Sequence, residues 1–345
     1  MKKNKAFSLV ELSVVILIIG ILIAGVTQSG RLIRQIKLST ARSLTSSSDV
    51  ASIRDVTAWF EATTPGVFTD INGNTDIDDK SKLRAWRDVN PQKSISDKPI
   101  MKNGEIYSSG STLTATNNTE PKYIISGING LPSVYFDGGA NNGDATLSDG
   151  TGDIISTTDT ATMPILAGDK TFSMFAVFRS DKGQAWQNST IVQIGDNAET
   201  LATQTFASIG LLGGVKDDSK PSRPGFVTTS AVISSWLTQE KITDYNDYIV
   251  GALVDYATPA TVDSTSVRVF VNSLTPVSYQ ADKTNAAAVI GAAIFTIGAD
   301  TKATPTTTSY FAGMISEVIV FDRKIKDEEA QGVMKYLRKK YNINN

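Results

Sequence analysis

The spacing of hydrophobic residues changes twice along the chain, and the first pattern is an unbroken apolar run near the N-terminus. The run extends from Phe7 to Val26, and no charged residue occurs between Leu12 and Gly30. A helix of this length, at about 1.5 Å per residue, matches the ~30 Å hydrocarbon core of a bilayer. A secretory signal peptide has a shorter apolar segment, of about 7–15 residues. The run therefore predicts a membrane-spanning helix.

Beyond this run, apolar residues recur at steps of three and four, which is the spacing of one face of a helix. They are Leu32, Ile33, Ile36, Val50, Ile53, Val56 and Phe60. This stripe predicts that a single helix continues from Phe7 to about Ala58 and packs its C-terminal half against a head domain. Pro65 and Gly66 end the helical region.

From about Trp59 the apolar positions alternate, as they do in strands. Clusters of Gly, Asp, Asn and Thr separate the candidate strands, which are Ser133–Phe136, Phe172–Arg179, Ile191–Ile194, Phe206–Leu212, Tyr248–Tyr256, Val267–Val271, Ala293–Ile297 and Ser309–Phe321. Short strands with long polar connections predict an antiparallel β-sandwich, a jelly roll. The expected fold class is α+β.

The last stretch predicts a C-terminal helix. Asp327 is its expected N-cap, and Glu328 and Glu329 suit the positive end of the helix dipole. Basic residues follow at the other end, where the dipole is negative. Its predicted buried stripe consists of Val333, Leu337 and Tyr341.

The amino-acid composition limits the kinds of binding and catalytic chemistry that the chain can perform. The 345 residues carry a net charge of −2, which gives no general attraction for nucleic acid. Cysteine is absent, which excludes disulfides and thiolate metal sites, and histidine is absent, which excludes imidazole bases and ligands. Enzymatic chemistry would therefore rest mostly on pairs of carboxylates.

One acidic residue, Glu11, lies inside the apolar run. A carboxylate is costly within a membrane, so it indicates a functional site. The surrounding sequence KNKAFSLVELSVVILIIGILIAG resembles the class III signal of type IV prepilins. That resemblance implies cleavage between Ala6 and Phe7 by a prepilin peptidase, N-methylation of Phe7, and a role for Glu11 as the family's acid. Ala6 stands where the family usually has glycine.

Assembly follows from the same resemblance. Once subunits leave the bilayer, the carboxylate of Glu11 would pair with the amine of Phe7 on a neighbouring copy, which removes an uncompensated buried charge. The bland alternative is a polar residue in a signal anchor near the headgroups. The implied partners are other copies, other pilins and the pilus assembly machinery. The precursor would cross the inner membrane once, and the assembled filament would be extracellular.

Five segments of the remaining chain resemble concanavalin A-like or laminin-G-like domains. They are AWFEA from Ala58, KLRAWRDVNPQ from Lys82, PKYIISGINGLPSVYFDGG from Pro121, FSMFAVFRS from Phe172 and the stretch FAGMISEVIVFDRKIKDEEAQGVMKYLRKKY from Phe311. The implied organisation is a leader over residues 1–6, a pilin helix over 7–58 and a β-sandwich head over 59–345.

An oxygen-rich loop is a candidate cation site. Alternate positions of DINGNTDIDD supply carboxylate and amide oxygens, the ligands that Ca²⁺ prefers. They are Asp70, Asn72, Asn74, Asp76 and Asp78. Thr75 and Ser81 occupy positions where an EF-hand has glycine and glutamate, so the loop is not an EF-hand. A solvated turn-rich loop is the alternative that we favour.

Two further kinds of side chain bear on the head's role. Trp186 lies in the polar stretch SDKGQAWQNST and is the best candidate to contact a ligand, whereas Trp59 and Trp86 are expected in the core. The nearest acidic strand offers Glu317 and Asp322, whose spacing of five places them on opposite faces, so they cannot form a glycosidase pair.

Three functions compete. The first is a major or minor type IV pilin whose head adheres to glycans or surface proteins. The second is a type II secretion or competence pseudopilin. The third is a membrane-tethered carbohydrate-active enzyme, which the missing carboxylate array disfavours; we expect the chain not to be an enzyme.

Overall fold

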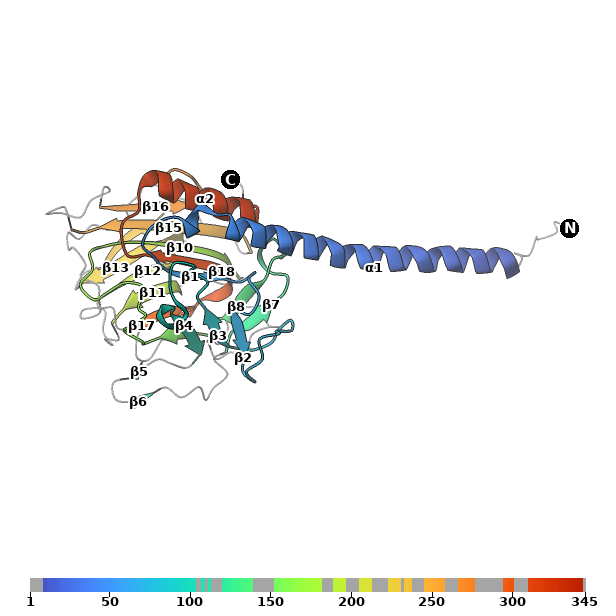
Figure 1. Ribbon diagram of the computed structural model, residues 1–345, viewed down its shortest axis with the longest axis horizontal. Helices are drawn as coiled ribbons and strands as arrows, with labels where there is room; N and C mark the ends of the chain where they lie inside the picture. Colours follow the sequence, from blue (N-terminus) through green and yellow to red (C-terminus); the bar gives the residue numbers. More distant parts are fainter. Residues whose placement is uncertain are drawn as a thin grey trace, which may run out of the picture.

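The computed structural model shows a long N-terminal helix attached to a β-rich head (Figure 1). It describes residues 9–103, 107–108, 111–112, 120–138, 152–181, 189–196, 205–212, 223–230, 233–237, 245–257, 266–276, 294–300 and 310–343. Most of helix α1, Leu9–Ser46, projects away from the head. At about 1.5 Å per residue its 38 residues measure roughly 57 Å.

Helix α1 ends about twelve residues earlier than predicted. Ser46 and Ser47 donate their hydroxyls to the carbonyl of Ser43, and Ser48 donates to that of Thr45. Serine hydroxyls that bond local backbone carbonyls in this way compete with continued helix. A 3₁₀ turn η1 follows, Asp49–Ala51, and Asp55, with φ 66°, turns the chain into a strand.

The prediction of one helix from 7 to 58 is therefore wrong beyond Ser46. Strand β1, Val56–Glu61, occupies the predicted helical end and pairs antiparallel with the last strand. The buried residues Val50, Ile53, Val56 and Phe60 belong to the head rather than to a helical stripe. Short runs of apolar residues fit either a helix or a strand, and the long-range pairing decided for the strand.

The first sheet, sheet A, has seven strands in the order β16-β15-β10-β18-β8-β7, with β1 also paired to β18. The bounds are β7 Lys122–Ile124, β8 Ser133–Asp137, β10 Thr171–Ser180, β15 Asp247–Asp255, β16 Val267–Val271 and β18 Ala312–Phe321. All the pairings are antiparallel. Strand β18 is central, since it pairs with β10 on one side and with β8 and β1 on the other.

The second sheet, sheet B, has nine strands in the order β14-β13-β12-β11-β17-β9-β4-β3-β2. The bounds are β2 Phe68–Asp70, β3 Leu83–Arg87, β4 Ile100–Asn103, β9 Ile155–Thr157, β11 Ser189–Gly195, β12 Thr205–Leu212, β13 Arg223–Ser230, β14 Ile233–Leu237 and β17 Ile294–Ile297. A separate two-stranded pair consists of β5 Tyr107–Ser108 and β6 Ser111–Thr112. Short 3₁₀ turns η2, Ile95–Asp97, and η3, Ile128–Gly130, lie between strands.

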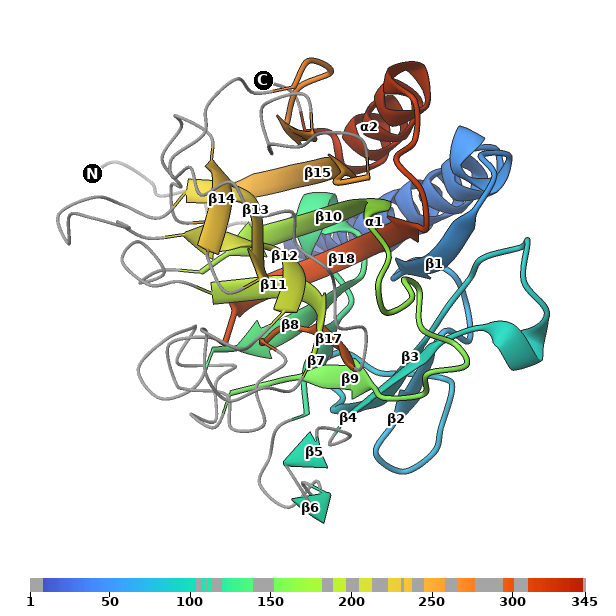
Figure 2. The same ribbon diagram turned by 90° about the vertical axis from the view of Figure 1, so that its left-hand side faces the viewer.

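The two sheets enclose the larger hydrophobic core (Figure 2). Phe60, Trp86 and Phe295 meet there as tilted and edge-on ring pairs, a packing that aromatic side chains favour. Trp86 is fully buried and Trp59 is nearly so, which confirms the expectation that both are core residues.

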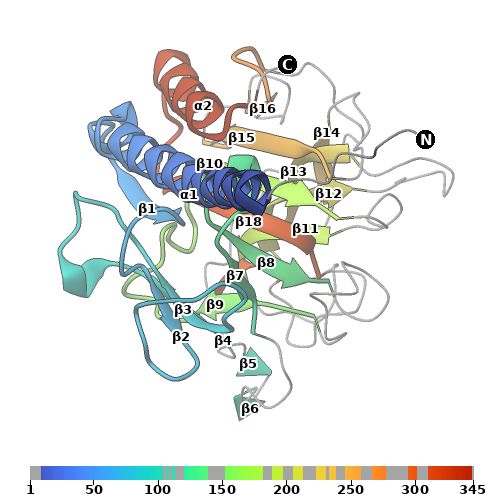
Figure 3. The same cartoon turned by 90° about the vertical axis from the view of Figure 1, so that its right-hand side faces the viewer.

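A second core covers the opposite face of sheet A. Along β18, Val318 and Val320 face the sandwich, whereas Ile319 and Phe321 face the helices. Strands buried on both faces read as continuous apolar runs rather than as alternation. Helix α2, Asp327–Tyr341, and the end of α1 cover the outer face of sheet A, so the sheet is buried on both faces (Figure 3).

The predicted fold class is confirmed: a long N-terminal helix, an antiparallel β-sandwich head and a C-terminal helix. All eight candidate strands correspond to strands of the structure, with ends shifted by a few residues. The stripe of Val333, Leu337 and Tyr341 on α2 is buried as predicted. Asp327 is the first residue of the helix rather than its N-cap; Lys326 is the cap, and its N–H donates to Glu329.

Candidate functional site

The part of α1 that projects from the head (Figure 1) carries many large aliphatic side chains that are exposed. Large aliphatic side chains from Leu9, which is 84% exposed, to Ile36, which is 56% exposed, lie outside any core. Among the described residues, α1 is the helix that is long and apolar enough to cross a membrane. An exposed apolar surface of this extent requires lipid or other helices around it.

The sequence analysis predicted that three residues at this end, Ala6, Phe7 and Glu11, take part in processing and assembly. Glu11 lies in the first turn of α1, where the positive end of the helix dipole favours a carboxylate. Ala6 and Phe7 lie outside the described residues. The predicted cleavage position and the predicted pairing of Phe7 with Glu11 therefore remain predictions.

Only the last turns of α1 dock on the head. Ala41 and Thr45 are buried at the spacing of one helix face. Two basic side chains add anchors, because Arg42 Nε donates to the carbonyl of Thr63 at 2.7 Å and Lys37 Nζ donates to that of Asn129 at 3.3 Å. The predicted contact of Leu32, Ile33 and Ile36 with the head is absent, since all three are exposed.

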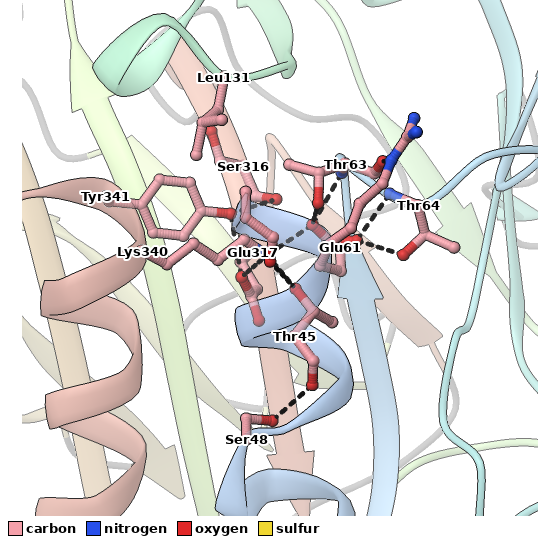
Figure 4. A network of polar contacts seen from close by, with 12 residues as sticks. Thr45, Ser48, Glu61, Thr63, Thr64, Leu131, Ser316, Glu317, Lys340 and Tyr341 are labelled. Carbon is pink, nitrogen blue, oxygen red and sulfur yellow. Dashed lines mark hydrogen bonds and ion pairs between the residues drawn. The ribbon is translucent and has the colours of Figure 1, made fainter. Parts of the chain in front are cut away.

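A buried ionic cluster lies beneath this junction (Figure 4). Lys340 Nζ, from α2, is 2.5 Å from Glu61 Oε1 and 2.9 Å from Glu317 Oε2. All three side chains are at most 1% exposed. Glu61 and Glu317 are directly opposed across the β1–β18 pairing, so the register of two strands far apart in sequence creates the cluster.

Polar neighbours complete the cluster. Thr45 Oγ1, from α1, accepts from Lys340 Nζ at 2.9 Å, which ties the projecting helix to α2. The hydroxyl of Tyr336 donates to Glu317 Oε1 at 2.8 Å. The cluster thus joins α1, β1, β18 and α2, the elements at the junction between stalk and head.

Hydrogen bonding distinguishes the two carboxyl groups. The remaining partners of Glu61 are the backbone N–H and hydroxyl groups of Thr63 and Thr64, which both donate to it. Those of Glu317 are the indole N–H of Trp59, at 2.7 Å, and the hydroxyl of Tyr341, at 2.9 Å. Glu61 therefore lies among donors that stabilise an anion, and Glu317 lies in a ring of aromatic side chains.

The pKa values of the two carboxyl groups shift in opposite directions, in agreement with their hydrogen bonds. Burial opposes ionisation of Glu61, but the charge of Lys340 and the hydrogen bonds outweigh it and hold its pKa below the usual range. Burial raises the pKa of Glu317, since the attraction of Lys340 is offset by repulsion from Glu61. One ammonium with one carboxylate leaves the cluster neutral, which avoids an uncompensated buried charge.

This pair of carboxyl groups is enclosed, which limits its chemistry. Two opposed carboxyls in adjacent strands resemble the spacing of a glycosidase pair. Here an ammonium lies between them and no side chain of the three has more than 1% of its surface exposed, so a sugar cannot reach them. Asp322, the partner considered from the sequence, lies exposed just beyond β18. Sequence reasoning missed Glu61 and Lys340, since only the strand register unites them with Glu317.

The oxygen-rich loop is arranged around one residue. The carboxylate of Asp70 accepts from the backbone N–H groups of Asn72, at 2.9 Å, and Asn74, at 2.7 Å, and from the Asn74 side chain. Asp76 and Asp78 are exposed. In the described part of the chain no three carboxylates gather as a metal site. Calcium binding here stays a prediction, and Trp186 lies outside the described residues.

Residues 1–27 match the family model of the prokaryotic N-terminal methylation motif. The chain begins with a prepilin-type N-terminus. This motif is that of a type IV pilin-type or pseudopilin precursor, and it implies processing by a prepilin peptidase and a membrane-anchored precursor. No curated protein matches the chain.

Several solved structures are similar to this chain. Domain 4 of AbnA, a GH43 extracellular arabinanase from Geobacillus stearothermophilus in complex with arabinotriose, is 14% identical, with a TM-score of 0.46, over 81% of this chain and 98% of that one. The Trypanosoma rangeli sialidase is 10% identical, with a TM-score of 0.42, over 83% of this chain and 33% of that one. A SAP-like pentraxin from Limulus polyphemus is 12% identical, with a TM-score of 0.39, over 59% and 81%. Likenesses this distant decide neither ligand nor activity.

Proposed function

We propose that this chain is a type IV pilin that assembles through α1 into an extracellular filament and displays the β-sandwich head. The observation that carries the proposal is the exposed, largely apolar stem of α1, Leu9–Ile36. It overlaps the methylation motif of residues 1–27, and only the last turns of α1 dock on the head. Such a helix suits first a bilayer and then a core of parallel helices.

Glu11 sets the register in this proposal. When copies of α1 pack together, a carboxylate among apolar helices is stabilised by a cation that meets it. Cleavage after Ala6 would supply that cation as the N-methylated amine of Phe7 on a neighbouring copy. Each subunit would then present its amine to the acid of the next.

The junction is suited to transmit force from α1 to the head. A filament transmits force from its helical core to its heads, and here α1 reaches the head through Arg42, Thr45 and the buried cluster. The same cluster fixes β1 and the C-terminal helix, so force enters both the first and the last strand of sheet A.

We further propose that the head binds a glycan or a surface protein at the rim of the sandwich, with Trp186 as a contact. The pair formed by Glu61 and Glu317 is enclosed and cannot act on a sugar, so it gives no support for a hydrolytic head. A pseudopilin would share the N-terminus, and the length of the assemblies separates the two.

The test replaces Glu11 with Val in a strain that makes filaments. We expect the variant to enter the membrane normally, since its apolar run is extended, and to be missing from filaments sheared from the cell surface. The matched control is Ser13→Ala, which removes a polar group of the same segment that bonds only its own backbone in the helix, to Val10. Wild-type filament yield from Glu11→Val would refute the assembly role.

A further inference from the structure

Lys340 has more acceptors than an ammonium can satisfy. Its Nζ lies within 3.1 Å of four oxygens, from Thr45, Glu61, Glu317 and Tyr336. An ammonium has three protons, so at least one contact is not a full hydrogen bond. The nitrogen lies against two carboxyl groups, and the side chains of Lys340, Glu61 and Glu317 are at most 1% exposed.

Glu61 is the nearest proton acceptor for this nitrogen. Its Oε1 is the oxygen nearest to Lys340 Nζ, at 2.5 Å. Thr63 and Thr64 fix its orientation through two backbone N–H groups and two hydroxyls. Transfer of one proton from Nζ to Glu61 leaves an uncharged amine with a lone pair, and a lysine amine becomes a nucleophile in this way.

Glu317 presents a carboxyl group to that amine. Trp59 Nε1 and the Tyr336 hydroxyl both donate to its Oε1, at 2.7 and 2.8 Å, and this is where negative charge would develop if the carbon were attacked. The other oxygen, Oε2, lies 2.9 Å from Lys340 Nζ and 2.9 Å from the Tyr341 hydroxyl. Burial favours the protonated acid, which is a better electrophile than a carboxylate.

We propose that Lys340 and Glu317 condense to form an amide cross-link between α2 and β18. The Nζ lone pair forms the new bond to Cδ of Glu317, and the bond from Cδ to Oε2 breaks. One proton of the ammonium goes to Glu61. A second leaves with the hydroxyl of Glu317 as water, and nothing is oxidised or reduced.

The position of this cross-link fits the mechanics of the junction. It closes the segment between the central strand of sheet A and the helix that contacts α1. The chain has no cysteine, so a disulfide cannot provide a covalent tie there. Once formed, the amide is shielded from hydrolysis by the same burial that keeps water away from the cluster. The inference does not depend on the proposed function.

The test is a tryptic digest of the full-length protein, extracted from membranes in detergent and analysed by mass spectrometry. Cleavage after Lys302 and Arg323 releases residues 303–323. Cleavage after Lys339 releases the second segment as residues 340–345 when Lys340 is amide-linked, whereas a free Lys340 is itself a cleavage site and leaves residues 341–345. The cross-link predicts a branched peptide that joins these two, with the summed mass less one water. Recovery of both segments only in unlinked form from the wild-type protein would overturn the proposal, whatever the variants do.

Variants identify the bond. Lys340→Met must lack the branched peptide, whereas Lys335→Met, which removes an exposed lysine of the same helix, must retain it. Glu317→Gln should lose ammonia instead of water and so yield a branched peptide of the same mass as the wild type. Glu61→Gln should slow its appearance at least tenfold, since the base is gone; an unchanged rate would remove Glu61 from the mechanism.

Discussion

A buried aspartate near the start of the head makes folding stability depend on pH. Asp88 is 5% exposed, and its Oδ1 accepts the backbone N–H groups of Trp59 and Asn90 at 2.9 and 2.7 Å. Its Oδ2 is buried without a hydrogen bond. Burial raises the pKa of Asp88 from 3.8 to about 6, against hydrogen bonds and lysine charges that lower it.

The direction of the pH effect on folding stability follows from the direction of the pKa shift. Because the folded state raises the pKa, ionised Asp88 destabilises the fold, and this cost is complete above about pH 6 and vanishes below about pH 4. At about 1.4 kcal/mol per pKa unit, the full cost is about 3 kcal/mol, and about 2 kcal/mol of it is relieved between about pH 7.5 and about pH 4.5.

The perturbation is Asp88→Asn, which keeps an acceptor for both N–H groups and removes the charge. We expect the free energy of unfolding of the variant, relative to wild type, to fall by about 2 kcal/mol between about pH 7.5 and about pH 4.5. Urea unfolding of the full-length protein in detergent, followed by fluorescence of the buried Trp59 and Trp86, measures both proteins. Parallel pH profiles would refute the assignment.

Three further predictions concern other parts of the chain. Thr45→Val should cost about 1 kcal/mol and increase amide hydrogen exchange in the last turns of α1 but not in sheet B, because α1 loses the hydroxyl that bonds Lys340 and Tyr336. Gly298→Ala should lower the free energy of unfolding by about 3 kcal/mol, since φ is +93° and a Cβ would lie 2.2 Å from the Phe136 ring. A Gly66→Ala control, with a similar φ and open space, should cost less. Millimolar calcium should leave Tm unchanged, because Asp70 is already hydrogen-bonded within its loop; a rise that Asp76→Asn abolishes would show a calcium site.

The local sequence pattern predicted those strands whose burial is visible in their own residues. The strands rich in Val, Ile and Phe, such as β10 and β18, were predicted because both of their faces are buried. Strand β13, Arg223–Ser230, was missed, since its sequence RPGFVTTS has proline and glycine as its second and third residues and its pairing depends on neighbours in sheet B. The end of α1 was missed because the apolar spacing of Val50 to Phe60 also fits a helix.

The residues of the candidate site also fall into two groups, one visible in the sequence and one created by the fold. Glu11 could be proposed from the sequence as an assembly residue, since a lone acid in an apolar run stands out whatever the fold. The cluster of Lys340, Glu61 and Glu317 could not be found, because its members are separated by up to 279 residues and meet only through the β1–β18 register. The available signal was the position of Lys340, which lies three residues after Leu337 on the buried face of α2. Lys340 was read instead as one of the basic residues that suit the C-terminal end of the helix.

The proposed filament role is tested most directly by the N-terminal peptide of the protein recovered from purified surface filaments. Mass spectrometry should find a chain that begins at N-methylated Phe7, because the amine that meets Glu11 exists only after cleavage behind Ala6. Recovery of the chain from membranes alone, still beginning with the lysines of its leader, would contradict the account.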